Sequence, residues 1–212
     1  MMKRPWYVLA FLIASSSLGL AQNGDEYHRN NVAVGFGPAI PVGNSTNYLG
    51  VAPLITAGYG YRFNRWFQAD AGLDFAFGAA NNRNGEVSDF GTVQGGDHEF
   101  MIPLGGRVYI PTRFSRIEAS VGAGTAYLHY SETVSQNGFG QNNCYSCTSR
   151  GGWGGYGLVN VNYFLDSTRN VHVGTTLQYI VGRTNGPAVG NVPGIQTTDH
   201  WVNLAFEFGL SF

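Results

Sequence analysis

The amino-acid sequence predicts an all-β protein, an eight-stranded antiparallel up-and-down transmembrane β-barrel. The 212 residues include 31 Gly, 14 Phe, 12 Tyr and 4 Trp, and only 12% of them are charged. Eight segments alternate between apolar and small or polar residues with a period of two, which indicates strands with two different faces. The connections alternate between short turns and long loops, as in membrane-spanning barrels. The formal net charge of −1 argues against a nucleic-acid partner.

The first 21 residues have the pattern of a secretory signal peptide. Lys3 and Arg4 precede an apolar run, and the small residues Gly19 and Ala21 fit a cleavage site. We expect export through the general secretory pathway, and an uncleaved N-terminal anchor helix is the alternative. Residues 22–30 are then a short periplasmic segment and residues 31–212 the barrel. The rest of the chain contains no apolar run near 18 residues, so a membrane would have to be crossed by strands.

The alternation places the predicted strands at 32–40, 55–63, 67–78, 100–110, 117–127, 153–165, 171–182 and 202–212. Short turns are expected at 64–66, 112–115 and 166–170. Long loops, rich in Asn, Gly and Ser, are expected at 42–51, 79–98, 132–152 and 184–199. Both termini then lie at the short-turn end. A hairpin hidden within 132–152 would raise the number of strands to ten.

The composition of the two faces decides which of them meets lipid. One face is rich in Val, Leu, Ile, Phe and Tyr, and the other in Gly and Ala with sparse charges. Small residues suit the narrow interior of a small barrel, so we expect the apolar face to point outward to outer-membrane lipids. Aromatic residues gather in two belts at the strand ends. The short-turn belt is Phe63, Trp66, Phe67, Phe114, Tyr163, Phe164 and Phe212, and the long-loop belt is Phe77, Phe100, Tyr127, Tyr130, Trp153, Tyr179 and Trp201.

The signal peptide, the eight alternating segments and the terminal stretch 204–212 together resemble the Gram-negative outer-membrane β-barrels. The OmpA-like eight-stranded transmembrane domain is the most similar group. Phe206, Phe208, Leu210 and Phe212 alternate along the last strand and resemble the signal that the outer-membrane assembly machinery reads. The resemblance implies a location in the outer membrane. The chain stops at Phe212, so the periplasmic domain that follows the barrel in OmpA itself is not expected.

Several charged residues fall on the predicted inner face. Buried charges persist only when they are paired, so we expect an interior network of Arg62, Asp70, Asp74, Arg107, Glu118 and Glu207, with His172 on the same face. Counting from the short turns places Arg62 close to Gln68 and Asp70 across one hairpin, and Arg107 diagonal to Glu118 across the next. A permanent network that fills the lumen is the favoured interpretation, and a gate for ions is the alternative.

Cys144 and Cys147 form a C-x-x-C motif in the third long loop. An exported protein favours a disulfide at such a pair, and no second Cys pair or nearby His supplies the remaining ligands of a zinc site. His98, His129 and His200 lie near the long-loop end, with Asp97 and Asp199 beside two of them. Adjacent residues of a strand point to opposite faces, so neither Asp-His pair forms a catalytic dyad. No catalytic residue, metal or cofactor is predicted.

The sequence therefore favours a non-enzymatic outer-membrane barrel with an envelope-structural role or a role in surface interaction through four long extracellular loops, whose ligand is unknown. A narrow pore for ions or small solutes is the second hypothesis, and a lipid-modifying barrel enzyme is the third. A secreted soluble barrel that binds a ligand is a fourth.

Overall fold

The computed structural model describes residues 27–47, 49–79, 87–88, 91–136, 144–187 and 196–212. The predicted signal peptide lies outside the described residues, as do the side chains of 87–88, 91–96, 133–136 and 144–148. Within the described part, no helix has the length and apolar character needed to cross a membrane. The elements follow in the order β1 (Asn30–Pro41), η1 (Gly43–Asn47), β2 (Ala52–Arg62), β3 (Phe67–Phe77), β4 (Val87–Ser88), β5 (Gly91–Ile110), β6 (Ile117–Gln136), β7 (Cys144–Phe164), β8 (Val171–Asn185) and β9 (Gln196–Ser211).

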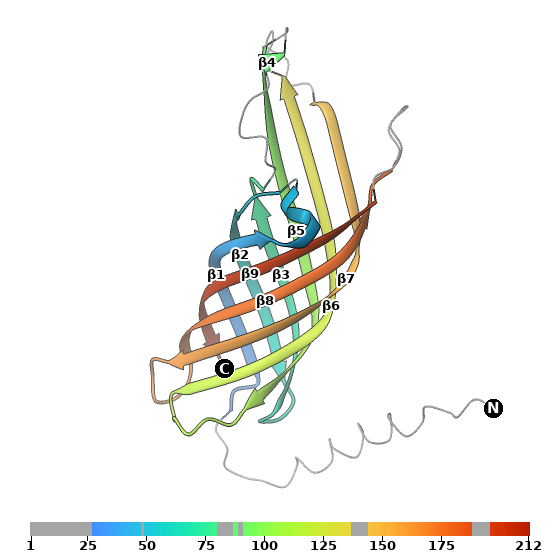
Figure 1. Cartoon of the computed structure of the whole chain (residues 1–212). Helices are drawn as coiled ribbons and strands as arrows, with labels where there is room; N and C mark the ends of the chain where they lie inside the picture. The colour runs from blue at the N-terminus through green and yellow to red at the C-terminus, as the bar shows by residue number, and fades with distance from the viewer. Residues whose placement is uncertain (1–26, 48, 80–86, 89–90, 137–143, 188–195) are drawn as a thin grey trace, which may run out of the picture.

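Eight of these strands close into an antiparallel up-and-down barrel, which confirms the predicted fold class. The strand order β3-β2-β1-β9-β8-β7-β6-β5 becomes a ring because β3 also pairs with β5. The first and last strands lie side by side, with the backbone N–H of Asn30 donating to the carbonyl of Phe212 and the reverse bond also present, both 2.9 Å. Both ends of the barrel sequence therefore lie at the short-turn end (Figure 1).

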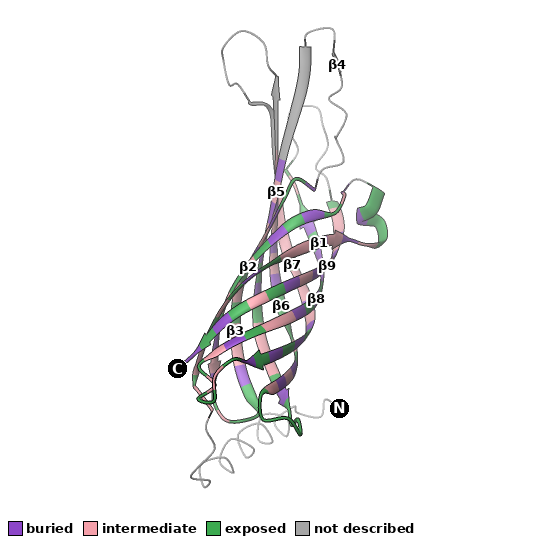
Figure 2. Cartoon of the chain, turned by 90° about the vertical axis from the view of Figure 1, so that its left-hand side faces the viewer, coloured by how far each residue is buried: buried purple, intermediate pink, exposed green. Residues whose placement is uncertain are grey.

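Side chains alternate between the lumen and the outer surface along every barrel strand. On β1, Val34 and Phe36 are 55% and 69% exposed, whereas Ala39 is fully buried. Figure 2 shows this alternation as bands of buried and exposed residues along the strands. An outer face built from large exposed apolar residues would be unfavourable in water, and it matches the surface that a lipid-embedded barrel needs.

Polar side chains hold the short turns. The Oδ1 of Asn64 accepts the N–H groups of Trp66 and Phe67 at 2.8 and 3.0 Å, which shapes the β2–β3 turn. The carboxylate of Asp166 accepts the N–H groups of Asn170 and Val171 at 3.0 and 2.9 Å in the β7–β8 turn. These bonds occupy backbone donors that have no ladder partner where the chain reverses.

Four strands extend well beyond the ranges that the sequence predicts. Strand β9 begins at Gln196, within the predicted loop 184–199, and β5, β6 and β7 extend furthest. The residues of β5, β6 and β7 stay paired beyond the end of β3, with Gly96 opposite Thr133 and Glu132 opposite Thr148. The three strands rise above the rest of the barrel as an extended sheet (Figure 1). Much of the predicted loops 79–98 and 132–152 is thus strand. In this extension β6 is paired on both sides, with β5 and with β7, and its backbone hydrogen bonds continue the ladder through Gly-, Ser- and Thr-rich sequence. The extension continues barrel strands, and β4 pairs only with β5, so the barrel count stays at eight.

Three members of the predicted aromatic belts point into the lumen. Tyr130, Phe164 and Trp201 are 5%, 4% and 0% exposed. Each shares its face with neighbouring lumenal residues two positions away, so the period-two rule overrides their position near a strand end. Other belt residues lie outside as predicted, including Trp153 at 60% exposure and Phe114 at 68%.

Candidate functional site

The lumen is the candidate site, and its short-turn end is closed by a charged group that we term the lower cluster: Arg62, Tyr109, Glu118 and Arg169. Arg62 lies at the end of β2 and Glu118 near the start of β6, both facing inward. The carboxylate of Glu118 pairs with Arg62 and with Arg169, each at 3.1 Å. The guanidinium of Arg62 also stacks over the ring of Tyr109, 3.7 Å from its centroid. One carboxylate therefore holds two arginines across the mouth of the barrel.

A second ion pair stands one layer deeper. The Nε of Arg107 donates to Asp70 at 2.7 Å, between the adjacent strands β5 and β3. The side chain of Gln68 links this pair to the lower cluster, since its Nε2 donates to Asp70 at 2.6 Å and its Oε1 accepts from Tyr109 at 2.7 Å. The two layers thus form one hydrogen-bonded network.

The hairpin count places Arg62 correctly, directly opposite Gln68 across the β2–β3 ladder, but the ion-pair partners in this network differ from those expected. Arg62 bonds Glu118 across the lumen, and Arg107 bonds Asp70, whereas counting from the short turns suggested Arg62 with Asp70 and Arg107 with Glu118. Counting residues from a short turn relates only the two strands that the turn joins. It omits the β3–β5 pairing, which brings Asp70 beside Arg107, and the reach of Arg62 across the narrow lumen.

Gln68, Asp70 and Arg107 of this network also line a polar cavity of about 90 Å³. Asp74, Glu207, His172 and Asn203 are among its lining residues. Glu207 accepts a hydrogen bond from Asn160 at 3.1 Å, and Asp74 accepts a longer one from Asn203 at 3.5 Å. The cavity has room for a few water molecules.

An apolar layer closes the lumen above the cavity, and we term it the apolar plug: Leu54, Met101, Leu128, Ile180 and Trp201. These residues come from β2, β5, β6, β8 and β9, and each is at most 1% exposed. They belong to one hydrophobic cluster of buried residues. The sequence interpretation missed this layer because it treated inward positions as polar or small, although the alternation already places Met101 among them.

A second charged group, the upper cluster, lies on the long-loop side of the plug: Asp97, Glu99, Arg150, Thr184 and Asp199. Asp199 pairs with Arg150 at 3.3 Å and accepts the Thr184 hydroxyl at 2.6 Å. The carboxylate of Asp97 accepts the N–H of Ala79 at 2.9 Å. Glu99 is 1% exposed, and neither of its carboxylate oxygens has a hydrogen-bond partner among the described residues. Of this cluster, the sequence pattern singles out only Asp97 and Asp199, as neighbours of His98 and His200.

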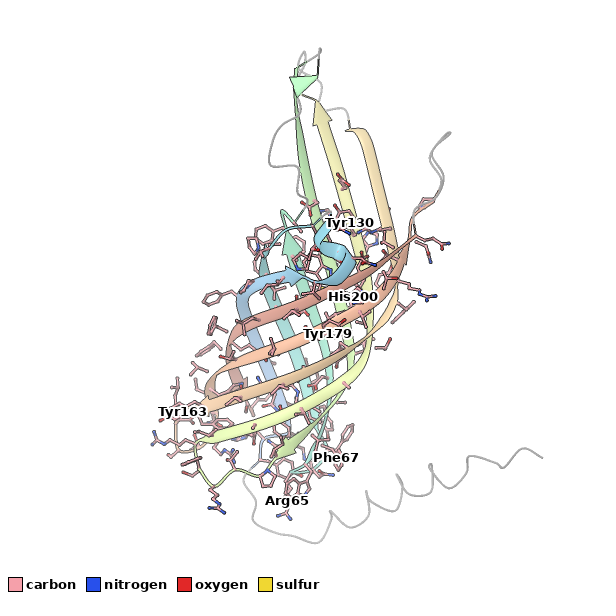
Figure 3. All side chains as sticks on the ribbon, in the orientation of Figure 1. Arg65, Phe67, Tyr130, Tyr163, Tyr179 and His200 are labelled. Atoms are coloured by element: carbon pink, nitrogen blue, oxygen red, sulfur yellow. The ribbon has the colours of Figure 1, made fainter. Side chains whose placement is uncertain are left out.

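The rim histidines do not join these carboxylates. His98 packs on the outer face against Phe75 in a tilted arrangement and edge-on against Phe100, while Asp97 beside it is buried. The Nδ1 of His200 bonds the Tyr179 hydroxyl at 2.8 Å, while Asp199 faces inward. Figure 3 places Tyr179 and His200 near the upper part of the barrel. In the described part of the chain, no group of three or more His, Cys, Asp or Glu side chains could hold a metal ion.

The two cysteines and the C-terminal apolar row are the remaining residues that the sequence singles out. Cys144 and Cys147 are in β7 rather than in a loop, opposite Ser135 and Thr133 of β6. Their side chains lie outside the described residues, so the disulfide stays a prediction. Phe206, Phe208, Leu210 and Phe212 all point outward from the end of the chain, with exposures of 47% to 64%.

Comparison with solved structures reveals barrels of the same size. The outer membrane protein OprG from Pseudomonas aeruginosa aligns with a TM-score of 0.58 and 13% identity, over 89% of this chain and 98% of that one. A major outer membrane protein from Thermus thermophilus aligns with a TM-score of 0.52 and 12% identity, over 87% and 98% of the two chains. The outer membrane protein AlkL, solved in DMPC lipid bilayers, aligns with a TM-score of 0.52 and 14% identity, over 91% and 94%.

The chain has the fold of the eight-stranded outer-membrane β-barrels. No family model matches it, and no curated protein matches it by sequence. At 12–14% identity the likeness extends to the fold and leaves the role of the lumen and of the upper strands to be argued from this chain's own residues.

Proposed function

We propose that the chain is an integral outer-membrane β-barrel without catalytic activity, whose role is structural in the envelope or lies in surface interaction through its extended extracellular end. The apolar outer face would contact outer-membrane lipids. The outward row Phe206, Phe208, Leu210 and Phe212 would serve as the strand read by the assembly machinery. Export would follow the general secretory pathway.

The closed lumen is the observation that carries this proposal. The lower cluster, the apolar plug and the upper cluster occupy successive layers, so little free space crosses the barrel. An eight-stranded barrel has an interior that side chains just fill. A filled lumen favours a role for the outer surface and the extracellular end.

A narrow pore is the second candidate, and the polar cavity above the lower cluster favours it. That cavity is about 90 Å³, and its lining includes Asp74 and Glu207. Conduction would require the apolar plug to open, because an unwetted apolar constriction blocks ions. A lipid-modifying enzyme has less support, because the rim histidines and the neighbouring carboxylates face opposite sides of the wall.

Deletion and trimming of the chain in its source bacterium would test the proposal. Glu132 and Thr148 are paired, so an Asn-Gly turn joining them removes 133–147 without disturbing the barrel register. We expect the deletion strain to lose resistance to detergent and vancomycin or to lose surface attachment, and wild-type protein to restore it. A second variant permutes residues 137–143 and so keeps the length of the segment while changing its sequence.

The readouts separate the two roles. If the envelope role holds, the trimmed barrel restores resistance. If surface interaction holds, only wild-type protein restores attachment, and the permuted variant does not. A deletion strain that equals its parent in both assays would contradict the proposal. Recovery of the protein in the soluble fraction without detergent would contradict the membrane location itself.

A further inference from the structure

The periplasmic mouth of the barrel is a vestibule of about 720 Å³. All three short turns contribute to it. Four guanidinium groups line it, from Arg62, Arg65, Arg116 and Arg169. Figure 3 places Arg65 at this lower end of the barrel. Arg62 and Arg65 lie at the β2–β3 turn, and Arg116 and Arg169 at the other two turns, so the fold gathers positive charge that is scattered along the sequence.

The carboxylates of the vestibule are already engaged. Glu118 accepts bonds from Arg62 and Arg169. The oxygens of Asp166 accept the Thr168 hydroxyl and two backbone N–H groups of their own turn. Arg116 is exposed, and its side chain has no hydrogen-bond partner among the described residues. The vestibule therefore presents positive charge that its own acids do not neutralise.

The two ends of the barrel differ in the sign of their charge. The described residues of the short-turn end carry six arginines and two carboxylates, namely Arg29, Arg62, Arg65, Arg113, Arg116, Arg169, Glu118 and Asp166. The described residues of the opposite rim carry two arginines and four carboxylates, namely Arg150, Arg183, Asp97, Glu99, Glu132 and Asp199. Among the residues that the structure describes, the short-turn end therefore carries the net positive charge, and this end faces the periplasm in barrels of this kind.

Aromatic side chains border the same vestibule. Trp66 and Phe114 line it and are 36% and 68% exposed, and the guanidinium of Arg65 lies 5.0 Å from the centroid of the Trp66 ring. Exposed aromatic rings at a strand end mark the height of the membrane interface. The arginines thus stand at the level of lipid phosphates, next to a surface that accepts acyl chains.

We propose that this vestibule binds the phosphate of an anionic phospholipid from the periplasmic leaflet of the outer membrane. The phosphodiester would pair with Arg116 and its neighbours, and the acyl chains would pass over Trp66 and Phe114 to the apolar outer wall. Guanidinium groups bind phosphate oxygens through charge-assisted hydrogen bonds. The proposal takes the membrane-spanning barrel as given but does not depend on the closed lumen or on the role of the upper strands.

Quenching of Trp66 fluorescence would test the contact. The protein without its signal peptide is placed in phosphatidylcholine nanodiscs that contain a minor fraction of dibrominated phosphatidylglycerol or dibrominated phosphatidylcholine. Trp153→Phe removes the tryptophan at the opposite rim, and Trp201 is fully buried in the plug. We expect stronger quenching by the brominated phosphatidylglycerol, and weaker quenching at high salt, because exposed charges are screened.

Matched arginine variants distinguish a specific lipid site in the vestibule from a general electrostatic attraction of anionic lipid to the protein. Arg116→Gln should weaken the apparent affinity for phosphatidylglycerol about fivefold, as one interfacial arginine does. Arg183→Gln removes the same charge from the opposite rim and should leave it unchanged. Equal quenching by the two lipids, or equal losses in the two variants, would overturn the proposal. Displacement by inorganic phosphate at constant ionic strength would also overturn it, since the vestibule would then take free phosphate.

Discussion

Glu118 is the residue on which the short-turn end of the lumen depends, because its carboxylate bonds both Arg62 and Arg169. Glu118→Gln would leave two guanidinium groups without their counter-charge, and the side chain of Arg62 is only 8% exposed. Breaking a buried pair from one side typically costs about 3–5 kcal/mol. We expect a loss of this size in urea unfolding of the folded barrel in lipid vesicles.

The exposed Arg113 provides the control for that measurement. Arg113→Gln should change the free energy of unfolding by about 0.5 kcal/mol or less. The double variant Arg62→Met with Glu118→Met removes both charges of the main pair. Its loss of unfolding free energy should therefore be smaller than the sum of the losses in Arg62→Met alone and Glu118→Met alone. Strict additivity would mean that the two side chains do not interact.

Gly37 tests the packing of β1 on β9. A Cβ at this position would lie 1.8 Å from the carbonyl oxygen of Leu204, which belongs to the backbone and cannot move aside. Gly58 also faces the lumen, but a Cβ there would meet nothing nearer than 3.9 Å. We expect Gly37→Ala to lower the thermal midpoint of the barrel and Gly58→Ala to leave it nearly unchanged. Similar midpoints for the two variants would contradict the observed strand approach.

The face of a residue is easier to predict from sequence than its partner. Alternation along β3 and β5 places Asp70, Asp74 and Arg107 inward, where the structure has them. The Arg107–Asp70 bond depends on the pairing of β3 with β5, which closes the barrel across a long connection. Sequence spacing within hairpins carries no information on that register, so the partners could not be predicted.

At the scale of elements, the β7–β8 turn is held by one carboxylate. Hydrogen bonds from Thr168, Val171 and Asn170 lower the pKa of Asp166 from 3.8 to about 2. A lowered folded-state pKa contributes stability above the pKa of the unfolded chain, near 4, and this contribution is lost as the pH falls toward 2. We expect the Val171 amide to exchange faster as the pH falls through this window, after correction for intrinsic exchange.

The carboxyl resonance of Asp166 gives the direct measurement. Its titration midpoint should lie near 2, well below the ordinary value. Asp166→Asn keeps one acceptor oxygen but does not ionise in this range, so the exchange of the Val171 amide should lose its pH dependence. A midpoint near 4 in the wild-type protein would show that the turn is not held in this way.

The strands are predicted well at their lower ends and poorly at their upper ends. Apolar alternation ends close to Asn64 and Asp166. Their side chains accept backbone N–H groups in the turns, and Asn and Asp are residue types that predict turns from sequence. Above the rim, β6 and β7 continue through Ser131 and Thr148 without an apolar face. Their order comes from ladder hydrogen bonds to neighbouring strands, which a pattern of hydrophobicity does not report.

At the scale of the whole molecule, the lumen alternates charged, polar and apolar layers. Reading β9 inward from the rim gives Asp199, Trp201, Asn203 and Glu207 on one face, which matches this order of layers. The closed eight-stranded barrel could be predicted from the number of strands and from the alternation of short turns with long loops. Alternation along the strands, continued to Leu54 and Leu128, places these two residues and Met101 on the inner face, so three members of the apolar plug could have been predicted. The five members come from five strands, however, and they meet only when the barrel closes.

The central claim is a closed lumen in a membrane-spanning barrel, and conductance in planar lipid bilayers tests it most directly. The wild-type protein, folded in detergent and inserted at neutral pH, is compared with Arg107→Ala, which removes the cation that faces Asp70. The account predicts background current from the wild-type protein at all moderate voltages. Reproducible unitary steps from the wild-type protein, altered in size or ion selectivity by Arg107→Ala, would contradict it.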